Sequence, residues 1–171
     1  MDRVRSFRGL VHIFLAQQGF TVLAVDYSAS AIAWVRESVA QSSGAVELAH
    51  SSIFTVPLPP EGFNFIYDSG CFHHVAPHRR QQYAALVSGA LKLGGAFGLV
   101  CFTPEGGSGF SDGQVYARRS LGGGLGYSEE SIRAIWSPTL EVQVLRRMHD
   151  HPVGSPVFGK SFLWAMLARK R

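Results

Sequence analysis

The chain has 171 residues, of which 46% are hydrophobic and 16% charged, a balance typical of one folded domain and incompatible with a disordered chain. Its apolar stretches fall well short of the roughly 18 residues that cross a bilayer, and no signal segment opens the sequence, so we expect a soluble, cytoplasmic protein without a membrane partner. The formal charge is +4, but the basic residues form no stripe that could follow a phosphate backbone, which argues against a nucleic-acid partner.

The first half of the chain alternates short apolar runs with segments of helical periodicity. Residues 21–25 (TVLAV) form a continuous run rich in β-branched side chains, as in a strand buried on both faces. Ser28 is a suitable N-cap for a following helix that ends near Gln41. The other elements expected here are a helix ending at Gly19, a strand over residues 46–49 and a buried strand over residues 63–67.

The second half continues the alternation. Residues 79–91 have helical periodicity, and residues 92–95 turn the chain into an apolar run over residues 96–102. Residues 103–127 are rich in glycine and show little periodicity, so we expect a mobile loop there. A short helix capped by Ser128 and two strands, over residues 140–148 and 161–169, complete the prediction.

Strands and helices in this order predict a single α/β domain over residues 1–171 with a mainly parallel sheet. Ligands of such sheets bind beyond the carboxyl ends of the strands. The residues that follow the predicted strands are Asp26, Ser52, residues 68–74 and residues 101–104.

Asp26 lies between a strand and a helix. A carboxylate at this position can accept hydrogen bonds from the two hydroxyls of a ribose. An aspartate in the same place can also start the helix without any ligand. The strand-Asp-turn-helix pattern alone leaves both interpretations open.

Four segments together resemble the class I S-adenosylmethionine-dependent methyltransferases. Residues 14–28 are similar to the motif whose acidic residue holds the cofactor ribose, and residues 46–54 to the turn that holds adenine. Residues 63–75 resemble the fourth strand and its loop, and residues 91–97 the LKPGG turn. The resemblance implies a Rossmann-like sheet, mostly parallel, with an antiparallel strand near the C-terminus.

The resemblance also implies a site for S-adenosylmethionine. Asp26 would hold the ribose, with Tyr27 beside the adenine and Ile53 against its ring. Ser52 stands where many members have an acid for the adenine amino group, and Asp68, Ser69 and Gly70 would lie near the methionine end. Gly9 falls on the last glycine of the family's glycine-rich turn.

The start of the chain departs from this family pattern. Arg5 and Phe7 fall on two glycine positions of the turn, and Arg3 falls on its usual acid. We therefore predict that the first strand is missing. Three explanations remain open: a fragment or misplaced start, a degenerate relative that binds no cofactor, or an improvised element over residues 3–10.

His73 and His74 follow the predicted strand over residues 63–67. One of them could act as a general base, and His74 is our candidate catalytic residue. They could also bind a metal with His78 and Cys71, or bond to the loop backbone; without a positioned carboxylate and a second nearby cysteine, we predict no metal site. The only cysteines are Cys71 and Cys101, too few for a disulfide framework and in keeping with a reducing cytosol.

Taken together, the motifs predict methyl transfer from S-adenosylmethionine to a small-molecule acceptor. The alternative is a non-catalytic member of the family that serves as a partner subunit and no longer binds the cofactor. A homodimer is compatible with either function.

Overall fold

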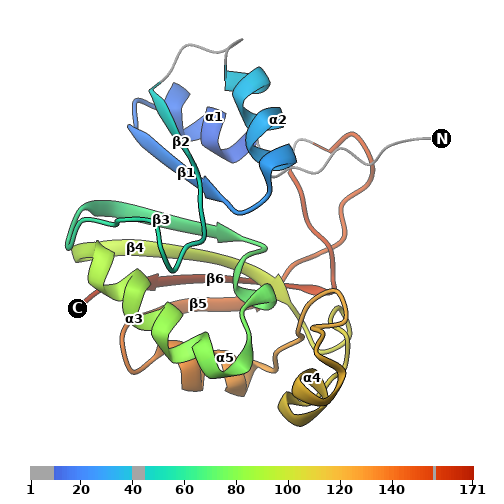
Figure 1. Cartoon of the computed structure of the whole chain (residues 1–171). Coiled ribbons are helices and arrows are strands. Elements are labelled where there is room, and N and C mark those ends of the chain that lie inside the picture. The colour runs from blue at the N-terminus through green and yellow to red at the C-terminus, as the bar shows by residue number, and fades with distance from the viewer. Residues whose placement is uncertain (1–9, 40–44, 156) are drawn as a thin grey trace. The chain divides into compact units, whose positions relative to one another are not determined.

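The computed structural model describes residues 10–39, 45–155 and 157–171, and the chain divides into two compact units, residues 1–57 and 58–171. We call these the N-terminal unit and the C-terminal unit. The N-terminal unit contains α1 (Leu10–Gln17), β1 (Val22–Asp26), α2 (Ala29–Val39) and β2 (Val46–His50), as labelled in Figure 1. The C-terminal unit contains β3 (Phe63–Ser69), the 3-10 helices η2 (Phe72–His74) and η3 (Pro77–Arg79), α3 (Arg80–Ala90), β4 (Leu91–Phe102), α4 (Asp112–Arg118), α5 (Glu129–Trp136), β5 (Glu141–Arg147) and β6 (Leu163–Arg169).

In the N-terminal unit, β1 and β2 form a two-stranded parallel sheet. Helix α2 buries Ile32 and Val35, the apolar positions expected from its periodicity. Helix α1 ends two residues before Gly19, whose φ of 87° allows the chain to reverse into β1. The helix, strand, helix and strand predicted for this segment are therefore present.

In the C-terminal unit, four strands form a sheet in the order β3-β4-β6-β5. Strand β4 pairs parallel with β3, whereas β6 is antiparallel to both of its neighbours. Parallel pairs followed by an antiparallel strand near the C-terminus confirm the predicted α/β fold class.

The core of the C-terminal unit is aromatic. Helices α3 and α5 lie side by side on one face of its sheet (Figure 1), and α5 places the fully buried Trp136 against the sheet. The Trp136 ring lies 4.6 Å from that of Phe97 in β4 and 5.3 Å from that of Phe72 in η2, between ring centroids. This packing fixes the segment that follows β3, because Phe72 belongs to it.

Among the described strands, no strand of the N-terminal unit pairs with a strand of the C-terminal unit. Strand β1 pairs only with β2, and β3 pairs only with β4, among the residues that the structure describes. The resemblance puts the family's first strand in the middle of the sheet. The prediction of a missing first strand concerns residues 1–9, which lie outside the described residues, and it stays a prediction.

Residues 103–127 differ from the prediction of an irregular loop, because they contain α4. Ser111 accepts a hydrogen bond from the backbone N–H of Gln114, and the Gln114 side chain accepts one from the backbone N–H of Ser111, which makes a capping box. Val115 is buried on the helix. The expectation was wrong over residues 112–118, where this capping signal is local and the surrounding glycines obscure it.

The strand expected over residues 96–102 also differs, because β4 begins at Leu91 and includes the predicted turn. Gly94 has a φ of 72°, and the register with β3 shifts between Phe63 and Phe65. The turn is thus an irregularity within a long strand. Among the described helices, none is long and apolar enough to cross a membrane.

Candidate functional site

Asp26 ends β1 and also starts α2. Its Oδ1 accepts a 2.8 Å hydrogen bond from the backbone N–H of Ser28, and the Ser28 hydroxyl in turn accepts one from the N–H of Ala31. Within the described residues, no further hydrogen bond occupies the carboxylate, so Oδ2 can accept one from a ligand. The helix-starting and ligand-binding interpretations of Asp26 are therefore compatible.

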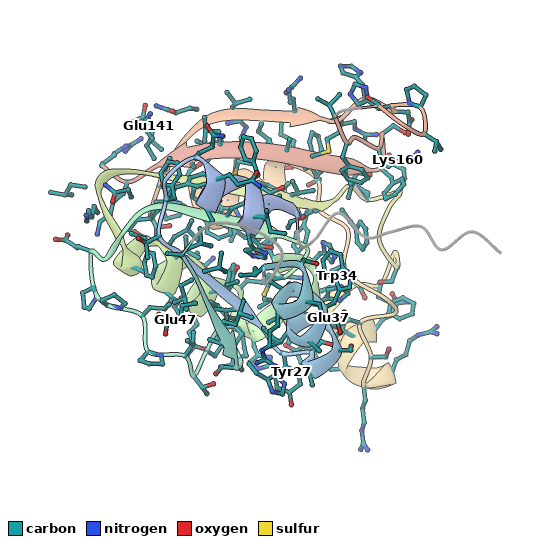
Figure 2. The ribbon with its side chains drawn as sticks, turned by 90° about the horizontal axis from the view of Figure 1, so that it is seen from above. Tyr27, Trp34, Glu37, Glu47, Glu141 and Lys160 are labelled. Atoms are coloured by element: carbon teal, nitrogen blue, oxygen red, sulfur yellow. The ribbon has the colours of Figure 1, made fainter. Side chains whose placement is uncertain are left out.

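Parallel pairing brings the ends of β1 and β2 together. Asp26 is paired with His50, whose Nε2 lies 3.0 Å from the backbone oxygen of Tyr27. The Tyr27 ring itself is 80% exposed, and Figure 2 shows it at the start of α2. In the turn after β2, Ser52 and Ile53 are half-buried, and the Ser52 hydroxyl accepts a hydrogen bond from the N–H of Phe54. Four of the predicted cofactor residues thus lie at one edge of the N-terminal unit.

His12, on α1, adds a group that the sequence did not indicate. Burial lowers the pKa of the His12 imidazole, and the nearby Asp26 charge acts in the opposite direction. A single histidine in an apolar helix carries no spacing signal, and only the fold shows that its charge interacts with that of Asp26.

Asp68, the last residue but one of β3, has a different environment, because its side chain is buried. Its carboxylate accepts hydrogen bonds from the backbone N–H groups of Cys71 (2.7 Å) and Phe72 (2.9 Å) and from the Tyr83 hydroxyl (2.7 Å). Burial raises the pKa of Asp68 despite these hydrogen bonds, which favour the charged form. The carboxylate therefore holds the loop after β3 in shape. After it come Ser69, which is exposed, and Gly70, whose φ of 106° favours glycine.

The two histidines after β3 have different surroundings. The His73 ring is buried and stacks on Phe102, with 3.9 Å between ring centroids, and the His73 backbone oxygen accepts a 2.8 Å hydrogen bond from the N–H of Leu125. His74 is exposed, and its ring centroid lies 4.5 Å from that of His73. A structural role accounts for His73, whereas the His74 side chain is exposed to solvent.

The loop after β3 contains Cys71, one of the side chains considered as a metal ligand in the sequence. Cys71 is exposed and Cys101 is buried, both as free thiols, and burial raises the pKa of the Cys101 thiol well above its ordinary value. Within the described ranges, no group of three or more His, Cys, Asp or Glu side chains is arranged to hold a metal ion.

A family model described as a methyltransferase domain matches residues 8–95 of the sequence. The chain belongs to this family of methyltransferase domains. The match spans the residues around Asp26 and Asp68 and confirms the predicted family. S-adenosylmethionine is the cofactor that this membership supports.

Solved structures of methyltransferases share the fold. An S-adenosylmethionine-dependent methyltransferase from Methanosarcina mazei is 16% identical, with 92% of this chain and 85% of that chain covered and a TM-score of 0.69. TehB from Haemophilus influenzae is 16% identical over 96% of this chain and 55% of that one, with a TM-score of 0.71. A 1,6-didemethyltoxoflavin-N1-methyltransferase from Burkholderia thailandensis, solved with 1,6-didemethyltoxoflavin and S-adenosylhomocysteine, is 20% identical over 95% and 67% of the two chains, with a TM-score of 0.67. A search of the curated proteins finds no match.

The described residues of this methyltransferase domain fit the adenosine half of the cofactor. Asp26 has an oxygen available for ribose hydroxyls, and the exposed Tyr27 ring offers an apolar surface to a base. Ser52 can accept a hydrogen bond, although more weakly than the acid common in the family. Gly9, the remaining residue predicted for this site, lies outside the described residues.

Proposed function

We propose that this methyltransferase domain transfers a methyl group from S-adenosylmethionine to a small-molecule acceptor. The observation that carries the proposal is the carboxylate of Asp26, which ends a parallel strand with one oxygen unoccupied among the described contacts, beside the exposed ring of Tyr27. The acceptors named for solved relatives of this fold, such as 1,6-didemethyltoxoflavin, are small molecules and support that class.

Each cofactor residue has a distinct role in this proposal. Asp26 accepts hydrogen bonds from the ribose hydroxyls, and its charge disfavours a phosphate on the ribose. Tyr27 and Ile53 pack against the adenine, and Ser52 accepts a hydrogen bond from its amino group. The family resemblance assigns the turn Asp68-Ser69-Gly70 to the methionine end of the cofactor, and the hydrogen bonds of the buried Asp68 keep the shape of this turn.

When bound, S-adenosylmethionine supplies an electrophilic methyl group on a sulfonium. The chain orients the acceptor and receives the proton that a hydroxyl or amine must lose. His74 is the proposed base, because its imidazole is exposed on the loop after β3 and histidine is the side chain that most often serves as a general base.

The remaining predictions belong to the same proposal. The two units form one methyltransferase domain over residues 1–171. The free thiols of Cys71 and Cys101 support a reducing compartment, the cytoplasm. Sedimentation equilibrium distinguishes the predicted homodimer from a monomer.

Calorimetric titration of the whole chain with S-adenosylhomocysteine tests the cofactor site. Asp26→Asn keeps an oxygen that caps α2 but removes the charge, and we expect binding to weaken about tenfold or more, since hydrogen bonds to charged groups contribute about 1.5–3 kcal/mol. Glu37→Gln is the matched control, because Glu37 is an exposed carboxylate farther along α2 (Figure 2). Absence of binding by the unaltered chain would overturn the proposal in favour of a non-catalytic family member.

A further inference from the structure

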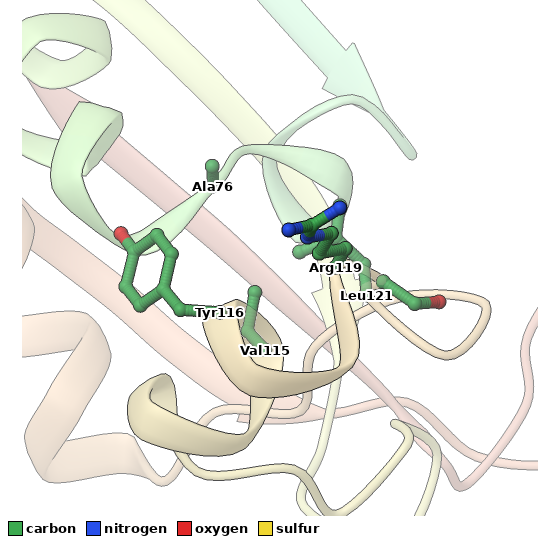
Figure 3. A pocket seen from close by; sticks show the side chains of 6 residues that line it. Ala76, Val115, Tyr116, Arg119 and Leu121 are labelled. Atoms are coloured by element: carbon green, nitrogen blue, oxygen red, sulfur yellow. The ribbon is translucent and has the colours of Figure 1, made fainter.

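A pocket of about 420 Å³ lies within the C-terminal unit, between α4 and the segment that joins η2 to η3. Figure 3 shows Ala76 on one side and the end of α4 on the other. These segments follow β3 and β4, which are parallel neighbours, so the pocket lies in the loops beyond their carboxyl ends, where ligands of α/β sheets bind. It is lined by Ala76, Val115, Tyr116, Arg119, Ser120 and Leu121.

The lining combines apolar side chains with a single charge. Ala76, Val115 and Leu121 are apolar, and Arg119 is the only charged residue in the lining. Asp112, the acid on the same helix, is held by both terminal nitrogens of Arg80, each at 2.9 Å. Among the described residues no carboxylate forms an ion pair with Arg119, so its positive charge is available to a ligand.

The backbone at Arg119 is held in a conformation that favours glycine. Arg119 is the C-cap of α4, with φ 49° and ψ 38°, and its N–H donates to the backbone oxygen of Tyr116. Glycine is abundant in this segment, yet this position carries an arginine whose side chain lines the pocket (Figure 3).

Tyr116 forms a wall of the pocket and is held in place from outside α4. Its hydroxyl accepts a 3.0 Å hydrogen bond from the backbone N–H of His78 and lies 2.8 Å from His78 Nδ1. Because His78 belongs to η3, the two sides of the pocket are tied to one another. This contact links the two segments that border the pocket.

We propose that this pocket binds the methyl acceptor and that the acceptor is a small organic acid. Its apolar body packs against Ala76, Val115 and Leu121, and its carboxylate binds the guanidinium of Arg119, whose planar fork suits that group. The role as acceptor rests on the proposed function, whereas the chemical class rests on the lining of the pocket.

Titration of the isotope-labelled whole chain by NMR tests the class of ligand, with benzoate, benzyl alcohol and acetate as probes. Benzoate should shift the amide signals of Ala76 and residues 115–121 in a saturable way. Benzyl alcohol, which lacks the charge, and acetate, which lacks the apolar body, should each bind about threefold to tenfold more weakly. Equal affinity for benzoate and benzyl alcohol, or shifts that fall elsewhere, would overturn the proposal.

Two variants of Arg119 separate ligand binding from folding. Arg119→Met removes the charge and keeps most of the stem, and Arg119→Gly removes the side chain while suiting the backbone conformation. Both should weaken benzoate about threefold to tenfold. Arg118→Met is the matched control, because its guanidinium lies over the Phe110 ring, 4.7 Å from the centroid, and is not part of the lining. An equal loss of benzoate affinity in Arg118→Met would show that the affinity depends on net charge in general, and it would reject the assignment of Arg119.

These titrations contain no cofactor, so their outcome does not depend on whether S-adenosylhomocysteine binds. If benzoate binds but S-adenosylhomocysteine does not, the pocket is an anion site but its role in binding a methyl acceptor is rejected. If S-adenosylhomocysteine binds but benzoate does not, the proposal for the pocket is rejected and the proposed function stands.

Discussion

The hydroxyl of Tyr83 donates a 2.7 Å hydrogen bond to Oδ2 of Asp68, and both side chains are buried in the C-terminal unit. The same carboxylate accepts hydrogen bonds from the N–H groups of Cys71 and Phe72. One side chain therefore joins the end of β3, the following loop and α3.

Asp68→Ala should destabilise the protein strongly. It removes the acceptor of the hydrogen bonds from the Tyr83 hydroxyl and from the N–H groups of Cys71 and Phe72, and we expect a loss of about 3 kcal/mol or more in the free energy of unfolding. Tyr83→Phe removes one hydrogen bond to a charged group and should cost about 1.5–3 kcal/mol. Urea unfolding followed by tryptophan fluorescence measures both.

The control for Tyr83 is Tyr116→Phe. Its exposed hydroxyl bonds to His78, and its removal should cost less than about 1 kcal/mol. Equal losses for Tyr83→Phe and Tyr116→Phe would contradict the importance of the bond to Asp68.

Gly124→Ala should be destabilising for a steric reason. Gly124 has a φ of 131°, and an added Cβ would lie 2.7 Å from Cε2 of Phe102 and 3.0 Å from Cδ2 of His73. Backbone strain alone costs about 1–3 kcal/mol at such a position, and the contacts add to it.

Gly113→Ala, in α4, is the matched control for Gly124. A Cβ there meets nothing within 4 Å, and alanine is the better helix former, so we expect a gain of about 0.5 kcal/mol. Thermal unfolding of both variants should therefore shift in opposite directions. A shift in the same direction would argue against the close packing of Gly124 on Phe102.

The stability of the protein should depend on pH through the exposed carboxyl of Glu105. Its own backbone N–H and the guanidinium of Arg147 hold the pKa of the Glu105 carboxyl at about 2, below its ordinary 4.5. A depressed pKa in the folded state stabilises the fold above the unfolded pKa, and this contribution disappears as pH falls from 4.5 toward 2.

Glu105→Gln removes that dependence. The difference in urea midpoint between the unaltered protein and the variant should be constant above about pH 5 and should shrink as the pH is lowered to about 3. A difference that does not change over this range would show that folding does not depress the pKa of the Glu105 carboxyl.

Arg80→Lys should weaken the attachment of α4 to α3. Arg80 binds Asp112 through two nitrogens, and its Nε donates to the Tyr127 hydroxyl at 3.2 Å. Lysine cannot form this fork, so we expect a loss of about 1 kcal/mol in unfolding free energy. Arg133→Lys is the control, because its pair with Glu129 is exposed and one turn apart on α5; it should cost less than about 0.5 kcal/mol.

Local patterns in the sequence were sufficient for most of the fold. The apolar run over residues 21–25 and the capping residue Ser128 mark elements through their immediate neighbours, and these elements are present as β1 and α5. Helix α4 was missed because glycines surround its local capping signal, and its Asp112 pairs with Arg80, which is distant in the sequence. Periodicity in a short glycine-rich segment does not reveal such contacts.

The sequence predicted where the candidate site residues lie relative to the strands, but it did not predict which groups surround their side chains. Sequence motifs placed Asp26 and Asp68 directly after two apolar strands, and in the structure they lie within the carboxyl ends of β1 and β3. The two carboxylates differ because Tyr83 on α3 and the loop N–H groups donate hydrogen bonds to Asp68, while the Asp26 carboxylate accepts one from Ser28 alone among the described residues. The pocket beside Arg119 required both α4 and η3 and could not be inferred from any one segment.

The position of β6 between β4 and β5 has a consequence for the order in which the sheet is assembled during synthesis. Strands β4 and β5 leave the ribosome before the strand that joins them, and in the finished sheet β5 pairs only with β6 among the described strands. Until residues 163–169 emerge, the apolar edge of β4 is open, and β5 has no partner. A nascent chain that stalls before Leu163 should therefore be recognised by chaperones and proteases as incomplete.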